Sequence, residues 1–186
     1  MGEEQSFQKK DGKAVDRGTD DGELRDLLCK QNQSGETALY VTAECGNADL
    51  VRELINYCDI VLAGIQARKG FDAFHIAAMQ GDLEVLKILM EANVDLSIPF
   101  DPYNTTALHT AASQVHAVVV NFLLEKGSNL ATIVRSNGKI SFSAARNGHL
   151  EIVKSLLSKE PGIATRTDKK GQTSLHMAVK GIMFKW

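Results

Sequence analysis

The sequence predicts an all-α solenoid of stacked helix-turn-helix units joined by β-turn or hairpin-like loops. Two observations carry this prediction. A turn followed by two apolar helical segments recurs along the 186-residue chain at intervals of 33 to 35 residues. Each second segment also places apolar residues at i, i+3 and i+4, the spacing of one helix face. Hydrophobic residues make up 44% of the chain and charged residues 24%, as in ordinary globular proteins.

One apolar position of the first helix gives the period. It lies four residues after each turn glycine or its substitute, at Leu39, Phe74, Leu108, Phe142 and Leu175, with intervals of 35, 34, 34 and 33 residues. Small residues follow on the same helix, at Ala43, Ala78, Ala112 and Ala145. A period this regular is typical of a repeat protein, in which each unit buries its apolar face only against its neighbours.

The period divides the chain into successive units. We expect a disordered leader at 1–21, a partial unit at 22–34, repeats at 35–69, 70–103, 104–137 and 138–170, and an incomplete fifth repeat at 171–186. The fourth repeat is one residue short between Gly138 and Ala144. We expect its first helix to begin one residue later, with Phe142 at the leucine position and the second helix undisturbed.

Residues suited to the ends of helices recur in each unit. Side chains that can cap a helix N-terminus precede the first helix at Thr37, Asp72, Thr106 and Thr173, whereas the fourth unit has Ile140, which cannot cap. Glycines that can adopt the left-handed conformation end it at Gly46, Gly81 and Gly148. Val115 stands at this place in the third unit, where a β-branched residue predicts strain or another turn geometry.

The motifs "GETALYVTAECG", "GFDAFHIAAMQG", "NTTALHTAASQV" and "GQTSLHMAV" resemble ankyrin repeats over residues 22–182. More narrowly, "TALHTAA", "NGHLEIVKSLL" and "RTDKKGQTSLHMAVKG" resemble plant ankyrin proteins that carry a membrane-spanning PGG domain after their repeats. The resemblance implies a non-catalytic scaffold or adaptor in stress or defence signalling. It also implies that full-length relatives are anchored at a membrane, such as the plasma membrane.

This sequence has no PGG segment, and its apolar ending "IMFKW" replaces the second helix of the fifth unit. We therefore expect a truncated, cytoplasmic form that is marginally stable or self-associating. The alternative is a membrane-associated regulator tethered through a partner or a lipid. Met1, Gly2 and Ser6 match the minimal N-myristoylation pattern, although the acidic Glu3 makes the site a poor candidate.

The resemblance further implies that a protein partner binds a concave surface made by the turns and the outward side of the first helices. The candidate residues are Arg68, Lys69, Phe71, Met79, Tyr103, Thr105, Gln114, Lys139, Arg146, Lys169 and Lys170. The aromatic rings of Phe71 and Tyr103 would either anchor the partner or pack between adjacent turns. The basic tips would either pair with an acidic partner segment or simply be solvated.

Other classes of function find little support in the residues. The net charge of -2 favours neither nucleic acid nor an anionic membrane, and no apolar run approaches the roughly 18 residues of a membrane span. The three cysteines, Cys29, Cys45 and Cys58, predict reduced thiols. Three histidines at the same position of their units, His75, His109 and His176, predict imidazoles that bond to backbone at the turn. We expect neither a metal site, nor a cofactor, nor an enzyme.

Overall fold

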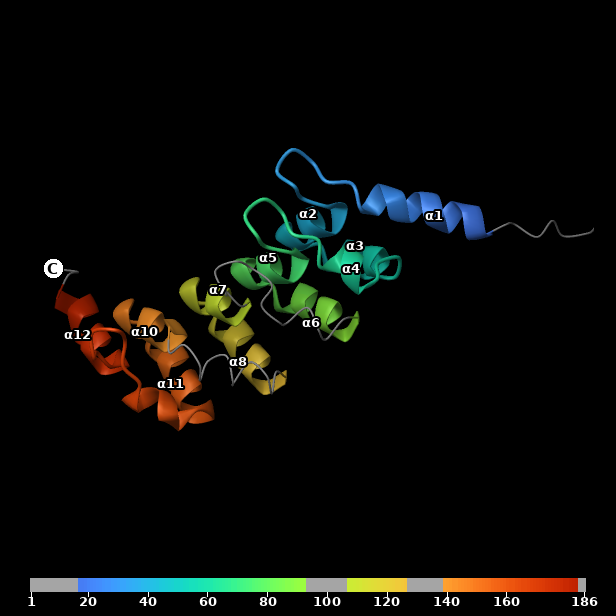
Figure 1. Cartoon of the computed structure of the whole chain (residues 1–186). Coiled ribbons are helices and arrows are strands. Elements are labelled where there is room, and N and C mark those ends of the chain that lie inside the picture. The colour runs from blue at the N-terminus through green and yellow to red at the C-terminus, as the bar shows by residue number, and fades with distance from the viewer. Residues whose placement is uncertain (1–16, 93–106, 127–138, 184–186) are drawn as a thin grey trace, which may run out of the picture.

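A computed structural model of the chain describes residues 17–92, 107–126 and 139–183, with side chains described except at 17–21, 139, 140, 142, 182 and 183. Within these ranges the regular secondary structure is entirely helical, which confirms the all-α class. The helices stack into an elongated array that runs from α1 at one end to α12 at the other (Figure 1).

Two rows of helices make up this array. The first row holds the first helix of each unit: α2 (Ala38–Glu44), α5 (Ala73–Gln80), α7 (Ala107–Ser113), α10 (Lys139–Arg146) and α12 (Ser174–Met183). The second row holds α3 (Ala48–Ile55), α6 (Leu83–Ala92), α8 (Ala117–Lys126) and α11 (Leu150–Lys159). Three more helices are α1 (Arg17–Leu28), α4 (Ile60–Ala63) and the 3₁₀ helix η2 (Pro161–Thr165). Successive first-row helices contact one another, and α2, α5, α7 and α10 each contact the second helix of their own unit.

The core lies between the two rows. Leu39, Phe74 and Leu108 are almost completely buried there, as their shared position in the repeat predicts. Leu175 occupies the same position in the fifth unit, yet 72% of its surface is exposed. The expected burial is wrong at Leu175 because, in the described part of the chain, no second helix packs over α12.

Side-chain caps begin the first helices of units 1 and 2. Thr37 Oγ1 accepts the backbone N–H of Tyr40 at 3.2 Å, and Asp72 Oδ1 accepts that of His75 at 2.9 Å. Both caps are as predicted, and each contributes about 1 kcal/mol by satisfying a free N–H of the first turn. The predicted cap Thr106 lies outside the described residues.

The residues that end the first helices adopt the left-handed conformation. Gly46, Gly81 and Gly148 have φ angles of 70°, 80° and 78°, which confirms their predicted role. Val115 has φ 69° and, among the described residues, is the only non-glycine residue with positive φ. The third unit therefore keeps the common turn geometry and carries the strain of a β-branched residue in it.

The fourth unit differs from the prediction. Helix α10 has 8 residues, as many as α5, and begins directly after Gly138 rather than one residue late. Counting back from the helix-ending Gly148, Phe142 falls at the histidine position, and Ser141 falls at the position expected to hold leucine or phenylalanine. Ile140 lies inside the helix instead of at its cap. The unit is thus shortened ahead of the helix, while α11 keeps the 10 residues of α6 and α8, as predicted.

In the shortened fourth unit, a buried hydroxyl occupies the core position that faces helix α12 of the fifth unit. Ser141 has no exposed surface, and its Oγ lies 2.7 Å from Oγ of Ser174 in α12. The hydrogen bond satisfies both hydroxyls, so a serine replaces the larger apolar side chain without leaving an unpaired polar group.

The N-terminal end begins earlier than expected. Helix α1 starts at Arg17, inside the segment 1–21 predicted to be a disordered leader. Its Leu28 is buried, and an ion pair joins Arg25 to Asp59 at the start of α4. The partial unit predicted at 22–34 therefore has the helix expected of it, with five more helical residues ahead of residue 22.

Candidate functional site

The turns that precede α2, α5 and α12 share one hairpin geometry. In each, a backbone N–H donates to the carbonyl four residues later, from 32 to 36, 67 to 71 and 168 to 172, at 2.8 to 3.0 Å. Adjacent tips are also tied together, because the Arg68 N–H donates to the Ser34 carbonyl at 3.0 Å. A Cβ added to Gly35 would lie only 2.9 Å from the Arg68 nitrogen. The tips of units 1 and 2 therefore form one rigid edge.

We call the surface formed by these turns and by the exposed side of the first-row helices the turn face. It corresponds to the surface that the sequence resemblance predicts for partner binding. Six of the candidate residues have exposed side chains there: Arg68, Lys69, Gln114, Arg146, Lys169 and Lys170. Tyr103 and Thr105 lie outside the described residues, and the side chain of Lys139 is not described. Their role in binding stays a prediction.

The ring of Phe71 is partly buried at the base of its turn. It packs against the core and stacks on the imidazole of His75, with ring centroids 6.0 Å apart and planes 28° from parallel. Phe71 therefore packs within its own unit, while packing between adjacent turns and anchoring of a partner both stay predictions. Only the remaining exposed part of the ring is available to a partner.

The histidines of the repeat support the turns. His75 is fully buried, and its Nδ1–H donates to Asp72 Oδ1 at 2.9 Å, the same oxygen that caps α5. At the equivalent pair in unit 5, the Thr173 N–H donates to Nδ1 of His176 at 3.2 Å, and Thr173 Oγ1 lies 2.8 Å from that nitrogen. The predicted bond from imidazole to backbone is confirmed at His176, whereas His75 holds the capping carboxylate.

A second histidine links neighbouring units. His116 Nε2–H donates to the carbonyl of Met79 at 2.9 Å. The ring fits because Gly81 has no side chain: a Cβ at that position would lie 2.3 Å from the His116 ring. Gly46 leaves similar room for Asp82 of the next unit, at 2.6 Å. These glycines thus serve close packing between units as well as backbone conformation.

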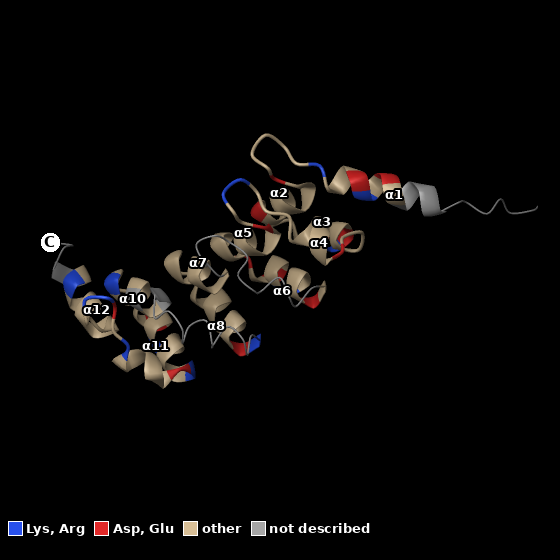
Figure 2. Ribbon diagram, viewed as in Figure 1, with Lys and Arg blue, Asp and Glu red and all other residues tan. Residues whose placement is uncertain are grey.

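Charged residues are unevenly distributed along the array (Figure 2). In the second row, Arg52 pairs with Asp49 at 3.0 Å, and Lys154 pairs with Glu151 at 3.0 Å. At the C-terminal end of the turn face, basic residues gather on α10, on α12 and in the turn between α11 and α12: Arg146, Lys169, Lys170 and Lys180. We call these four residues the basic end. Among the described residues, none of them has an ion-pair partner within 4.0 Å.

Lys180 was not among the residues predicted for the site. It follows Arg146 by 34 residues and so occupies the same position in the next repeat, which is the signal that could have identified it. The two positions adjoin because α12 packs closely on α10. A Cβ added to Gly181 would lie 1.7 Å from the Arg146 carbonyl oxygen, so only glycine permits this approach.

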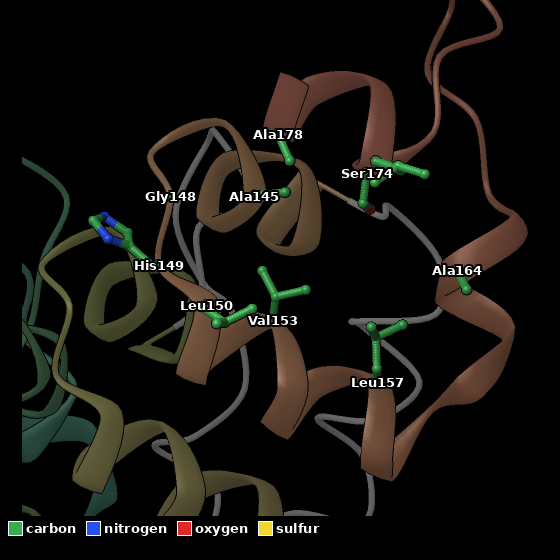
Figure 3. A pocket seen from close by; sticks show the side chains of 10 residues that line it. Ala145, Gly148, His149, Leu150, Val153, Leu157, Ala164, Ser174 and Ala178 are labelled. Atoms are coloured by element: carbon green, nitrogen blue, oxygen red, sulfur yellow. The ribbon is translucent and has the colours of Figure 1, made fainter. Parts of the chain in front are cut away.

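An apolar groove of about 430 Å³ opens between α11 and α12 (Figure 3). Val153 and Leu157 line it from α11, and Leu175 and Ala178 line it from α12. Its one hydroxyl, from Ser174, is bonded to Ser141, and the imidazole of His149 also lines it. The other lining side chains are apolar, so the groove presents mainly a surface for packing. Leu150, at the start of α11, also lines this groove and is 60% exposed.

The three cysteine thiols are free, and one of them has a raised pKa. Cys29, Cys45 and Cys58 are free thiols, and burial together with the Asp59 charge raises the pKa of Cys58 to about 11. A thiol with so high a pKa is a weak nucleophile at neutral pH. No group of three or more metal-binding side chains occurs within residues 17–92, 107–126 and 139–183. Nor, in those ranges, is any helix long and apolar enough to cross a membrane.

Sequence models of ankyrin repeats match most of the chain. One, describing three ankyrin copies, matches residues 14–98 and 60–134, and another, describing many copies, matches residues 141–181. The chain belongs to the ankyrin-repeat family. The first match begins at residue 14, three residues before the start of α1.

Several plant ankyrin proteins are similar to parts of this ankyrin chain. Ankyrin repeat-containing protein At5g02620 of Arabidopsis thaliana is 63% identical over 91 residues, which are 48% of this chain and 17% of that protein. Ankyrin repeat-containing protein ITN1 of the same plant is 48% identical over 80 residues, 43% of this chain and 14% of its own length. Ankyrin repeat-containing protein NPR4 of rice, Oryza sativa subsp. japonica, is 45% identical over 118 residues, which are 63% of this chain and 20% of that protein. The ankyrin chain thus spans a fifth or less of these curated relatives.

Proposed function

We propose that this ankyrin protein is a non-catalytic scaffold that binds a protein partner on the turn face. The observation that carries the proposal is the rigid edge of stacked turns. Neighbouring tips are hydrogen-bonded to one another, and the capping carboxylate of Asp72 is itself held by a buried histidine. A surface fixed in this way loses little conformational freedom when a partner binds, so more of the contact energy appears as affinity. Ankyrin repeats in general serve protein-protein interaction, which supports the same conclusion.

Site-specific photo-crosslinking tests this proposal. A benzophenone amino acid is placed at Gln80 or Gln114 on the turn face, and at Glu53 or Glu125 on the second row as matched controls. All four side chains are exposed, so the substitutions leave the core intact. We expect plant-extract proteins to crosslink from Gln80 and Gln114 and not from the controls. Crosslinking only from the second row would refute the turn face as the binding surface.

We further propose that the scaffold acts in the cytoplasm, in plant stress or defence signalling. The similarity to three plant ankyrin proteins supports the plant setting. The alternative is a regulator that reaches a membrane through a partner or a lipid. Fractionation of plant cells, before and after a stress treatment, separates the two: the scaffold is expected in the soluble fraction, and recovery with membranes that survives a salt wash would favour the alternative.

A further inference from the structure

The charge of the basic end indicates what kind of segment the partner presents to it. This inference rests on the proposed function, the binding of a protein partner on the turn face. Its residues belong to two successive units, with Arg146 and Lys180 on the helices and Lys169 and Lys170 at the turn tip. The close approach of α12 to α10 at Gly181 keeps the helix positions adjacent. Lysine and arginine side chains so placed repel one another unless an anion lies between them.

The carboxylate nearest the basic end is already used by the turn. Asp168 Oδ1 accepts the backbone N–H groups of Lys170 and Gln172, both at 2.8 Å. The pKa of Asp168 is held below its usual range, chiefly by the hydrogen bond from the Gln172 N–H. The Lys170 N–H and the charges of Lys170 and Lys180 lower it further. The carboxylate is therefore ionised, and one of its two oxygens accepts both of these turn N–H groups. Four cations and one carboxylate leave a net charge of +3.

The N-terminal end of the turn face has a different balance. Arg68 and Lys69 are accompanied there by Glu36 and Glu44, so the four charges sum to zero. These acidic residues affect Tyr40 nearby. Burial raises the pKa of its phenol most, and the negative charges of Glu44 and Glu36 add to the shift, which brings the pKa to about 12. An anionic ligand is thus attracted to one end of the turn face and not to the other.

We propose that the basic end binds an acidic segment of the partner protein. Neighbouring units lie roughly 10 Å apart, and an extended peptide rises about 3.3 Å per residue. A run of about four acidic residues therefore spans the two units. A long polyanion such as nucleic acid fits less well, because continuing along the turn face would bring it to Glu36 and Glu44.

The test uses a fluorescein-labelled peptide with four consecutive glutamates in a Gly-Ser-Ala background, and a matched peptide with four glutamines. Fluorescence anisotropy with the 186-residue chain should show binding of the glutamate peptide only, weakening as salt is raised. The variant Lys169→Glu/Lys170→Glu should weaken binding by about tenfold or more, because exposed ion pairs are lost and like charges replace them. The same charge change on the second row, at the exposed Lys126 of α8 and Lys159 of α11 (Lys126→Glu/Lys159→Glu), should leave the affinity within about twofold.

A charge swap completes the test. A tetralysine peptide should bind Lys169→Glu/Lys170→Glu better than it binds the unaltered chain, a result that misfolding of the variant cannot produce. Equal loss from Lys169→Glu/Lys170→Glu and from the second-row variant would overturn the proposal, as would binding of the glutamine peptide. Equally tight, equally variant-sensitive binding of single-stranded DNA or phosphatidylserine vesicles would also overturn it, since the basic end would then be a general anion surface. Crosslinking from Gln80 and Gln114 with no glutamate-peptide binding would refute the acidic segment and leave the proposed scaffold function standing.

Discussion

Replacing Val115 by glycine should stabilise the protein. Val115 has φ 69°, where a residue with a side chain costs roughly 1–2 kcal/mol, with a β-branched residue toward the upper value. Glycine removes that cost but makes the unfolded chain more flexible, which costs about 0.5–1 kcal/mol. The valine side chain is 49% exposed, so its loss removes about another 0.5–1 kcal/mol of burial. The balance is a gain of about 0.5 kcal/mol, or roughly 1–2 °C in melting temperature.

A matched substitution isolates the strain. Val118 is also exposed, at 66%, but lies in helix α8. Val118→Gly changes the unfolded chain in the same way as Val115→Gly and relieves no strain, so it should lower the stability by about 0.5–1 kcal/mol. We therefore expect the free energies of unfolding of the two variants to differ by about 1–1.5 kcal/mol in urea and calorimetric unfolding. Equal destabilisation of both, or a melting temperature for Val115→Gly no higher than that of the unaltered protein, would refute the strain argument.

Three further predictions concern single contacts. Gly81→Ala should lower the free energy of unfolding in urea by at least about 1 kcal/mol more than Gly148→Ala. Both glycines have positive φ, but only at Gly81 does the new Cβ meet an imidazole of the next unit, at 2.3 Å. Equal losses of stability would contradict this. Ser141→Ala should lower the free energy of unfolding by about 1–3 kcal/mol, because it leaves the buried hydroxyl of Ser174 without its partner. Adding Ser174→Ala should recover most of this loss. If the double variant loses as much stability as the two single variants together, the hydroxyl pair does not contribute. The pKa of Tyr40 is raised from 10.0 to about 12, so the phenol ionises first in the unfolded chain, and stability should fall by up to about 2.7 kcal/mol as the pH rises from 10 to 12. Tyr40→Phe should remove this part of the pH dependence, and an unchanged slope would argue against the shift.

Much of the fold could be predicted because the repeat supplies several copies of each position. Spacing predicts the helix-ending glycines, and they have the expected left-handed backbone. Spacing also places Val115 at the same position, but only the structure shows that it adopts the strained left-handed turn and not another geometry. The buried positions of Leu39 and Phe74 followed from the same comparison. Spacing suffices wherever a unit has complete neighbours, since each unit then meets the same surroundings.

The fourth unit could not be predicted in this way because its length is ambiguous. Counting forward from Gly138 places Phe142 at the leucine position, whereas counting back from Gly148 places it at the histidine position. Packing decides between them: Ala144 is buried between neighbouring first-row helices, and α10 keeps its full length. Leu175 was misjudged for a related reason, because its burial depends on a second helix that the described residues do not supply.

The candidate site was predicted in outline and missed in detail. The exposed tips were found from the turn spacing, but the role of Phe71 in stacking on His75 depends on ring orientation, which spacing does not contain. The gathering of four cations depends on how closely α12 approaches α10 at Gly181, a distance that only the packed structure gives.

The hydroxyl pair between Ser141 and Ser174 bears on how such a protein can be recombined. Their hydrogen bond joins side chains of two successive first-row helices, α10 and α12. A unit carrying Ser174 that was moved beside a different neighbour would bury a hydroxyl without an acceptor, and a foreign unit placed beside Ser141 would do the same. The last two units of the array are therefore a matched pair that we expect to be inherited, duplicated or grafted together rather than singly.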